Sequence, residues 1–270
     1  MAVDLLLSPQ TVLFRLKLYT RMFDGHAHLT HEKFQSDVES VIARARQSLS
    51  AVLCIGTSQI DSEHVLSLCQ RHPRFLYPVI GLSPHDAVTK NLPLELSFLK
   101  KHAEQAIAIG EIGLEYHYFK EKDHAVQIQA FRAQLELAES FSKPVQIHLR
   151  ESHAPAFEIL AEFPKLSVIL HCFYAPPFLS EALRRHYTLS LSTMKNKARD
   201  TIIKKAPLSS LQAETDSPYL WLNGRNESKN VQEVYERISS KRNIPISEVD
   251  RVLSETARRI YGIEIASKGL

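Results

Sequence analysis

Two histidines near the start of the chain have a spacing suited to metal binding. His26 and His28 lie in the segment DGHAH, residues 24–28, and are two positions apart. On an extended backbone, residues two apart point to the same face, so both imidazoles could chelate one ion. A packed or surface pair of histidines has the same spacing. The rest of the chain must therefore decide between these interpretations.

Four further polar residues stand in or directly after apolar runs. They are Glu111 in AIGEIG, His148 in PVQIHL, His171 in SVILHC and Asp216 in AETD. A buried polar side chain without a partner is costly, so each is expected to have one. With the histidine pair they supply four imidazoles and two carboxylates, a donor set for one or two divalent ions. Such ions lower the pKa of bound water to about 7.

The elements that would position these donors are eight β-rich runs that alternate with stretches of helical period. The runs cover residues 22–28, 51–56, 75–82, 106–113, 144–149, 167–172, 187–192 and 210–216. This alternation predicts an α/β fold with a parallel sheet, either a (β/α)8 TIM barrel or a doubly wound open sheet. In a barrel, functional side chains collect where several strands end. The candidate donors do so, which favours the barrel.

The chain continues beyond the eighth run with two further helices. One carries apolar residues over 231–238, and the other begins at Ser247 as a candidate N-cap. No linker divides residues 22–270, which we expect to form a single domain. Residues 1–21 precede it as an extension, in which the alternation over 12–18 indicates a strand-like arm or an unstructured segment.

Several motifs together resemble the TatD family of metal-dependent deoxyribonucleases, within the amidohydrolase superfamily. The motifs are FDGHAHL at 23–29, GLSPHD at 81–86, AIGEIGLEYH at 108–117, KPVQIHLRES at 143–152, HCF at 171–173, ETDSPYL at 214–220 and TARRIYG at 256–262. Their order and spacing cover nearly all of residues 22–262. Each is weak alone, but the set is specific.

The resemblance assigns roles to the metal-binding candidates. It implies that His26 and His28 bind a first ion, and that His148 and His171 bind a second. Glu111 would bridge both ions. The resemblance also implies that Asp216 binds the first ion or the attacking water and accepts the proton of that water. The expected cofactor is one or two divalent ions: Zn, Mn, Ni, Co, Fe or Mg.

Three residues are candidates for contacting substrate phosphate. Arg150 follows His148 by two positions and shares its face, and a guanidinium can grip phosphate bidentately. His85 is expected on a loop after the third run, where the family places a substrate-facing histidine. Arg225 lies in a stretch that resembles a family segment after ETDSPYL. A structural salt bridge remains the alternative for Arg150 and His85, and an ordinary surface loop for Arg225.

The sequence departs from the family pattern at positions outside the metal set. Ser83 stands where members often carry His, and Glu115 replaces the usual Asp. Gln212 interrupts the apolar eighth run. None of these changes removes a metal ligand, so we expect an active enzyme.

Composition and charge limit the possible partners. The 270 residues include 33 Lys and Arg against 30 Asp and Glu, a formal charge of only +3. DNA contact should therefore be local to the site and directed at phosphate. The three cysteines have no metal-finger or disulfide spacing, and no run is long enough to span a membrane, so we expect a cytoplasmic protein. The oligomeric state is open, with a monomer as the expectation.

Three functions remain open at this stage. The favoured one is hydrolysis of phosphodiester bonds at single-stranded DNA ends. The same metal-activated water could instead attack an ester or amide, as in a D-aminoacyl-tRNA deacylase. A metal-stabilised binding or scaffold protein is the third, although a scaffold gains little from six donors around an open ion site.

Overall fold

Eight parallel strands form one sheet in the order in which they occur along the chain. The computed structural model describes residues 22–222, 224–263 and 265. The strands are β1 Phe23–Ala27, β2 Ala51–Ile55, β3 Leu76–Ile80, β4 Ala108–Glu115, β5 Val145–Arg150, β6 Val168–Leu170, β7 Thr188–Leu191 and β8 Leu211–Ala213. Each lies within one of the eight runs that the sequence indicates, apart from two further residues at the end of β4 and one at the end of β5. The predicted extension, residues 1–21, lies outside the described residues.

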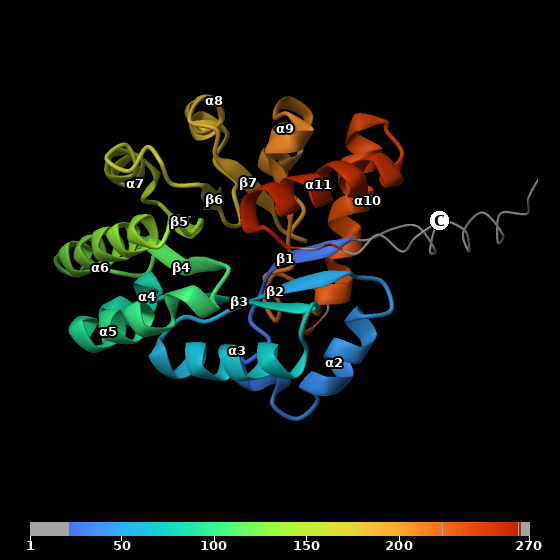
Figure 1. The fold of residues 1–270 in the computed structure, drawn as a ribbon. Coiled ribbons are helices and arrows are strands. Elements are labelled where there is room, and N and C mark those ends of the chain that lie inside the picture. The colour runs from blue at the N-terminus through green and yellow to red at the C-terminus, as the bar shows by residue number, and fades with distance from the viewer. Residues whose placement is uncertain (1–21, 223, 264, 266–270) are drawn as a thin grey trace, which may run out of the picture.

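Helices surround the sheet on its outer side (Figure 1). They are α2 Val38–Ala45, α3 Gln59–Arg71, α4 Pro84–Ala87, α5 Leu92–His102, α6 Glu121–Ser140, α7 His153–Leu160, α8 Leu179–Arg184, α9 Lys197–Lys205, α10 Gln232–Arg242 and α11 Ile246–Tyr261. Short 3-10 helices are η1 Glu32–Phe34, η2 Ala103–Gln105, η3 Pro176–Phe178, η4 Leu208–Ser210 and η5 Ser228–Val231. The prediction that Ser247 caps the last helix is wrong. The helix begins at Ile246, and its N-cap is Pro245, two residues before Ser247. The backbone φ of Pro245 is −59°, which leads directly into the helix.

Hydrogen bonds between the first strand and the segment after the last strand close the barrel. Ala27 forms a parallel bridge with Ser217, and the amide of His28 donates to the carbonyl of Ser217 at 2.7 Å. The amide of Asp216 donates to the carbonyl of His26 at 2.9 Å. The predicted (β/α)8 barrel is therefore confirmed, and the doubly wound alternative is not. Closure also places the metal-binding candidates of β1 beside Asp216.

Two strands are irregular at the residues that the sequence nominated for metal binding. The register between β1 and β2 shifts between Asp24 and Ala27, and that between β4 and β5 shifts between Ile109 and Ile112. Such irregularities re-aim side chains and are common beside active sites. Gly113, just after the second shift, has φ of +140°, and an added Cβ would meet the His148 carbonyl oxygen at 2.1 Å, so glycine is needed there.

A buried hydrogen-bond network inside the barrel supports the first strand. Gln146 donates to the carbonyl of Gly25 and to the hydroxyl of Tyr261, both at 3.0 Å. The Tyr261 hydroxyl donates to Gln212, whose amide donates to Gly25 at 3.3 Å. Gln212, which interrupts the apolar eighth strand, is thus a partner in this network. The network also connects α11 to the barrel interior.

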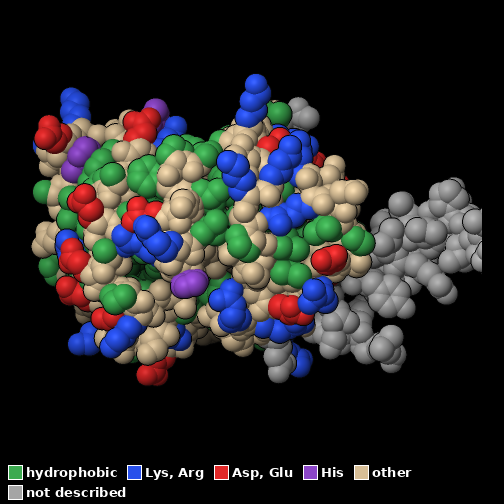
Figure 2. Space-filling view, turned by 90° about the horizontal axis from the view of Figure 1, so that it is seen from above, with side chains coloured by type: hydrophobic (Ala, Val, Ile, Leu, Met, Phe, Trp, Pro, Cys, Tyr) green, Lys and Arg blue, Asp and Glu red, His purple; other side chains and the backbone are tan. Residues whose placement is uncertain are grey.

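The surface carries charges of both signs. Lys and Arg side chains and Asp and Glu side chains are both spread over the face shown in Figure 2. This distribution agrees with the small net charge of +3. None of the described helices is long and apolar enough to cross a membrane.

Candidate metal centre

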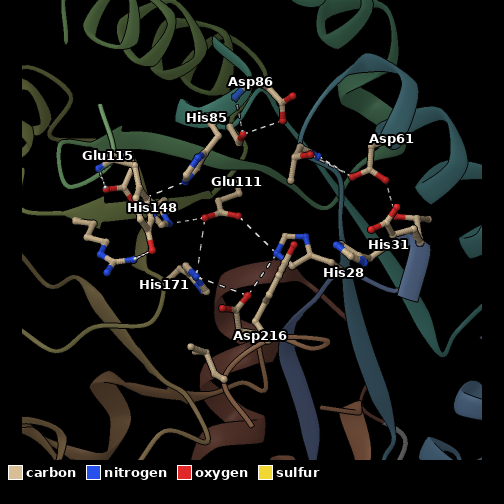
Figure 3. Close-up of a pocket in the computed structure, with 18 residues that line it drawn as sticks. His28, His31, Asp61, His85, Asp86, Glu111, Glu115, His148, His171 and Asp216 are labelled. Atoms are coloured by element: carbon tan, nitrogen blue, oxygen red, sulfur yellow. Dashed lines mark hydrogen bonds and ion pairs between the residues drawn. The ribbon is translucent and has the colours of Figure 1, made fainter. Parts of the chain in front are cut away.

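A first group of donors comes from β1, β4 and the segment after β8. The Nε2 atoms of His26 and His28 are 3.2 Å apart. Glu111 Oε2 is 3.7 and 3.6 Å from these two nitrogens, and Asp216 Oδ1 is 3.8 and 3.4 Å from them. Two donors bound to one Zn-like ion, each about 2.1 Å away, are separated by about 3.0–3.4 Å. The first group therefore has spacings close to those of one coordination shell, and Figure 3 shows His28, Glu111 and Asp216 of this group beside one another.

A second group shares Glu111 with the first. Its other oxygen, Oε1, is 2.7 Å from His148 Nδ1 and 3.9 Å from His171 Nε2. The same His171 nitrogen is 4.0 Å from Asp216 Oδ1. The donor atoms of Glu111, His148 and His171 all lie within 4.8 Å of one another. Because Glu111 directs one oxygen to each group, it is placed as a bridging ligand would be.

A buried amide fixes the tautomer of His26. The Nδ1 atom of His26 is 2.7 Å from Gln146 Oε1. The amide nitrogen of Gln146 donates to Gly25 and Tyr261, so its oxygen is the acceptor and His26 Nδ1 carries the proton. His26 Nε2 is therefore free to bind an ion. Partners of this kind set the orientation and basicity of metal-bound histidines.

Glu214 has the equivalent role for His171, and it was not among the residues singled out for the site. Its Oε1 atom is 2.9 Å from His171 Nδ1 and accepts a hydrogen bond from the Cys172 amide at 2.8 Å. Glu214 is completely buried. The sequence signal that could have identified Glu214 was its position two residues before Asp216. That spacing places two residues on one face only in an extended strand, and β8 ends at Ala213, before both carboxylates. The rings of His171 and His26 stack with their centroids 3.7 Å apart.

Asp24 binds the backbone at Thr215, the residue between Glu214 and Asp216. It accepts hydrogen bonds from the amide and the hydroxyl of Thr215, at 2.8 and 2.6 Å. Burial raises the pKa of Asp24 to about 7, although the hydrogen bonds from Thr215 favour its charged form. Asp24 therefore supports the segment that carries Asp216 and does not face the ion space itself.

The ionisation of the site suits a divalent cation. Burial would raise the pKa of Glu111 and Asp216, but His148 and His171 respectively outweigh it and lower both. Burial disfavours protonated His148, but Glu111 and Glu115 raise its pKa to about 9. Asp216 likewise raises the pKa of His28 against the effect of burial. Burial and the neighbouring His171 lower the pKa of His26. The carboxylates are thus ionised, and His28 and His148 hold protons that a metal ion would displace.

The donors open into a cavity of about 750 Å³. Arg150 and His85 line it, as expected of substrate contacts. The Arg150 guanidinium lies 4.6 Å from the Tyr118 ring centroid and donates to its hydroxyl at 3.0 Å. The His85 Nε2 atom lies 3.7 Å from Glu115 Oε2. The prediction that His85 lies on a loop is wrong, because His85 belongs to a short helix. Ser83 at the N-cap and Pro84 in the first turn start the short helix α4.

Arg225, the third candidate for contacting substrate phosphate, lies outside the metal cavity. Arg225 donates to both carboxylate oxygens of Asp37 at 2.7 Å, to the Lys33 carbonyl at 2.6 Å and to Glu227 at 3.2 Å. It is not among the described residues that line the cavity. The structure does not bring Arg225 to the metal centre, because these carboxylates engage its guanidinium.

A metal-dependent hydrolase barrel is the class that this fold and donor set define, and comparison with known proteins specifies the family. A model of the family described as TatD related DNase matches residues 23–262. The chain is 31% identical to the "Uncharacterized metal-dependent hydrolase YabD" of Bacillus subtilis, over 90% of this chain and 99% of the relative. It is also 31% identical to the "3'-5' ssDNA/RNA exonuclease TatD" of Dickeya dadantii, over 89% and 97%. The chain therefore belongs to the TatD-related DNase family.

Solved structures support the same fold. The TatD homologue YJJV of Escherichia coli matches with a TM-score of 0.83 at 22% identity, over 91% of this chain and all of that chain. A TatD family hydrolase of Entamoeba histolytica matches with a TM-score of 0.81 at 19% identity, over 91% and 99%. At these identities the similarity concerns the barrel alone.

Proposed function

We propose that this protein is a divalent-metal-dependent deoxyribonuclease that shortens single-stranded DNA from an end. The observation that carries the proposal is the placement of Glu111 between two histidine groups, with Asp216 beside both. Family membership and the relative described as a 3'-5' ssDNA/RNA exonuclease support the same activity. The comparisons do not favour the deacylase, and the complete donor set argues against a scaffold.

Six residues would hold the ions. His26 and His28 would bind the first, His148 and His171 the second, and Glu111 both. Bound there, divalent ions would lower the pKa of water and stabilise negative charge on phosphodiester oxygens. Asp216 would bind the first ion and accept a proton from the attacking water, since its carboxyl is ionised. We propose two ions per chain, drawn from Zn, Mn, Ni, Co, Fe or Mg.

Substrate phosphate would meet Arg150 and His85 on the cavity wall. Arg150 is positioned by Tyr118, and its guanidinium can grip two phosphate oxygens. His85 faces the same cavity and is about half exposed. Because the net charge is small, these contacts and the ions would supply the attraction for DNA.

We further propose a cytoplasmic monomer. Cys54, Cys69 and Cys172 all lie in the described part of the chain and are free thiols. Reduced cysteines are typical of the cytosol. Size-exclusion chromatography with light scattering would test the monomer, and cell fractionation the compartment.

The test is a cleavage assay on an end-labelled single-stranded oligonucleotide after EDTA stripping and separate addition of Mg, Mn and Zn. The wild type should give a ladder of shortened products that also defines polarity. Asp216→Asn should abolish turnover and keep much of the metal. Glu158→Gln, an exposed carboxylate-to-amide change on α7, is the matched control and should cleave normally. No cleavage with any ion, despite bound metal, would refute the proposal.

A further inference from the structure

A second cavity lies next to the metal cavity. Its volume is about 390 Å³, within the range of small-molecule sites, which is roughly 300–1,000 Å³. It is lined by Thr193, Met194, Lys195, Leu220, Trp221, Leu222 and Glu233. Leu220 lines both cavities and so forms a wall that they share. The second cavity is thus adjacent to the cavity that holds the candidate metal-binding residues.

The shared wall is firmly attached to the metal centre. The Tyr219 amide donates to the carbonyl of Asp216 at 2.8 Å, and the Thr193 hydroxyl donates to the carbonyl of Leu220 at 2.9 Å. The buried amide of Asn226 donates to the carbonyls of Thr215 and Tyr219, at 2.9 and 2.8 Å. A molecule held in the second cavity would therefore have a set position relative to Asp216.

Exposed apolar side chains concentrate at the two cavities. Among the described residues, seven large hydrophobic side chains are exposed. Tyr118 and Tyr219 line the metal cavity, and Met194 and Leu222 line the second. Four of the seven therefore lie where substrate would pass. Exposed apolar surface that clusters in this way marks a binding site.

The chemistry of the second cavity selects its occupant. Trp221 offers an indole ring, and Met194 and Leu222 add apolar surface. The charged groups at this cavity neutralise each other, since Lys195 Nζ is 2.8 Å from Glu233 Oε2. A cavity with apolar walls and no net charge suits a flat aromatic group with polar edges better than a phosphate. In a single-stranded nucleic acid that group is the base.

We propose that this cavity, with Trp221 as its stacking platform, binds one nucleobase of the DNA strand whose phosphodiester lies at the metal centre. The inference rests on the proposed nuclease function and specifies how a single strand is held there. A base inside a duplex is stacked on both sides and paired, so the subsite would also select single-stranded ends.

Kinetics with three variants test the subsite. Trp221→Ala should raise the KM for single-stranded oligonucleotides about tenfold, the effect of losing one stacked base, with kcat within about twofold of wild type. Trp221→Phe keeps an aromatic ring and should retain most of the affinity. Leu94→Ala removes an exposed apolar side chain on α5 that lines neither cavity, and should change nothing. Hydrolysis of bis(4-nitrophenyl) phosphate, which carries no nucleobase, should be the same in all four proteins.

Fluorescence provides a direct measurement, because Trp221 is the only tryptophan of the chain. A cleavage-resistant phosphorothioate oligonucleotide of eight nucleotides, added to the metal-loaded protein, should quench the emission with a Kd that follows the KM. An unchanged KM in Trp221→Ala, or no quenching at saturating oligonucleotide, would overturn the subsite and leave the nuclease intact. Failure of the wild type to cleave any oligonucleotide would instead refute the nuclease function on which it rests.

Discussion

Removal of Glu214 should weaken metal binding at the second group of ligands without removing any ligand. The Glu214 carboxylate is fully buried and accepts from His171 Nδ1 at 2.9 Å. Burial disfavours protonated His171, but Glu214 is the largest of the charges that raise the pKa of this histidine well above its usual value. Partners of this kind contribute about 10–100-fold to metal affinity, or about 1.4–2.7 kcal/mol.

Two substitutions separate charge from geometry. Glu214→Ala loses the hydrogen bond to His171 and also leaves the Cys172 amide without its acceptor, so we expect a loss near 100-fold for one of the two ions. Glu214→Gln retains an oxygen acceptor but not the charge, so we expect the affinity for the same ion to fall about tenfold. The unpaired Cys172 amide should also lower the free energy of unfolding of the alanine variant by about 1–3 kcal/mol.

Competition with a chromophoric chelator would measure the two affinities, and circular dichroism would establish that each variant is folded. Glu158→Gln is the control for loss of a carboxylate outside the site. The affinity of the ion held by His26 and His28 should change less than that of the other. If folded Glu214→Ala binds both ions within twofold of wild type, His171 is not a ligand held by Glu214, and the reasoning fails.

Three further predictions concern stability, metal affinity and their dependence on pH. Asn226→Ala removes the donor that holds the carbonyls of Thr215 and Tyr219, and calorimetry should show a loss of about 3 kcal/mol together with a lower kcat. Apparent metal affinity should rise as pH rises from 6 to 9, because the ion displaces a proton from His148, whose pKa is about 9; titration calorimetry would detect the released proton, and a flat profile would contradict the assignment. Burial lowers the pKa of His153 to about 4, so above pH 6.5 both folded and unfolded chains hold it neutral. As pH falls from 6.5 to 4 only the unfolded chain gains the proton, so up to about 3 kcal/mol of stability is lost, a loss that His153→Phe should reduce in urea titrations.

Local patterns were enough to predict the barrel and the polar residues that meet at one end of it. Strand positions follow from short apolar runs, and the ligands stand in or near their ends. Because parallel strands in a barrel all end on one side, residues as distant as His26 and Asp216 were expected together. The structure brings them to within 3.8 Å. That argument needs only periodicity and order along the chain.

Contacts between distant segments lay beyond such patterns. Gln146 and Gln212 are polar residues in apolar strands, and their partner Tyr261 is 115 and 49 residues away along the chain. The sequence also presented Arg225 as a cation near the site, whereas Asp37, 188 residues away, engages it. Neither pairing has a local signal, since each depends on which helices and loops pack together.

The sequence by itself determined the fold class and which polar side chains gather at one end of the barrel, because both depend on residue type and on the period and order of the strands. The tertiary structure alone decided how Glu111 divides its two oxygens between the histidine groups, since the register of β4 shifts at that point. It also decided that Trp221 lines a cavity beside the metal centre, because that cavity forms only where the segments after β7 and β8 meet α10. Backbone irregularity and the packing of loops depend on contacts across the whole chain, so the local period of the sequence does not predict them.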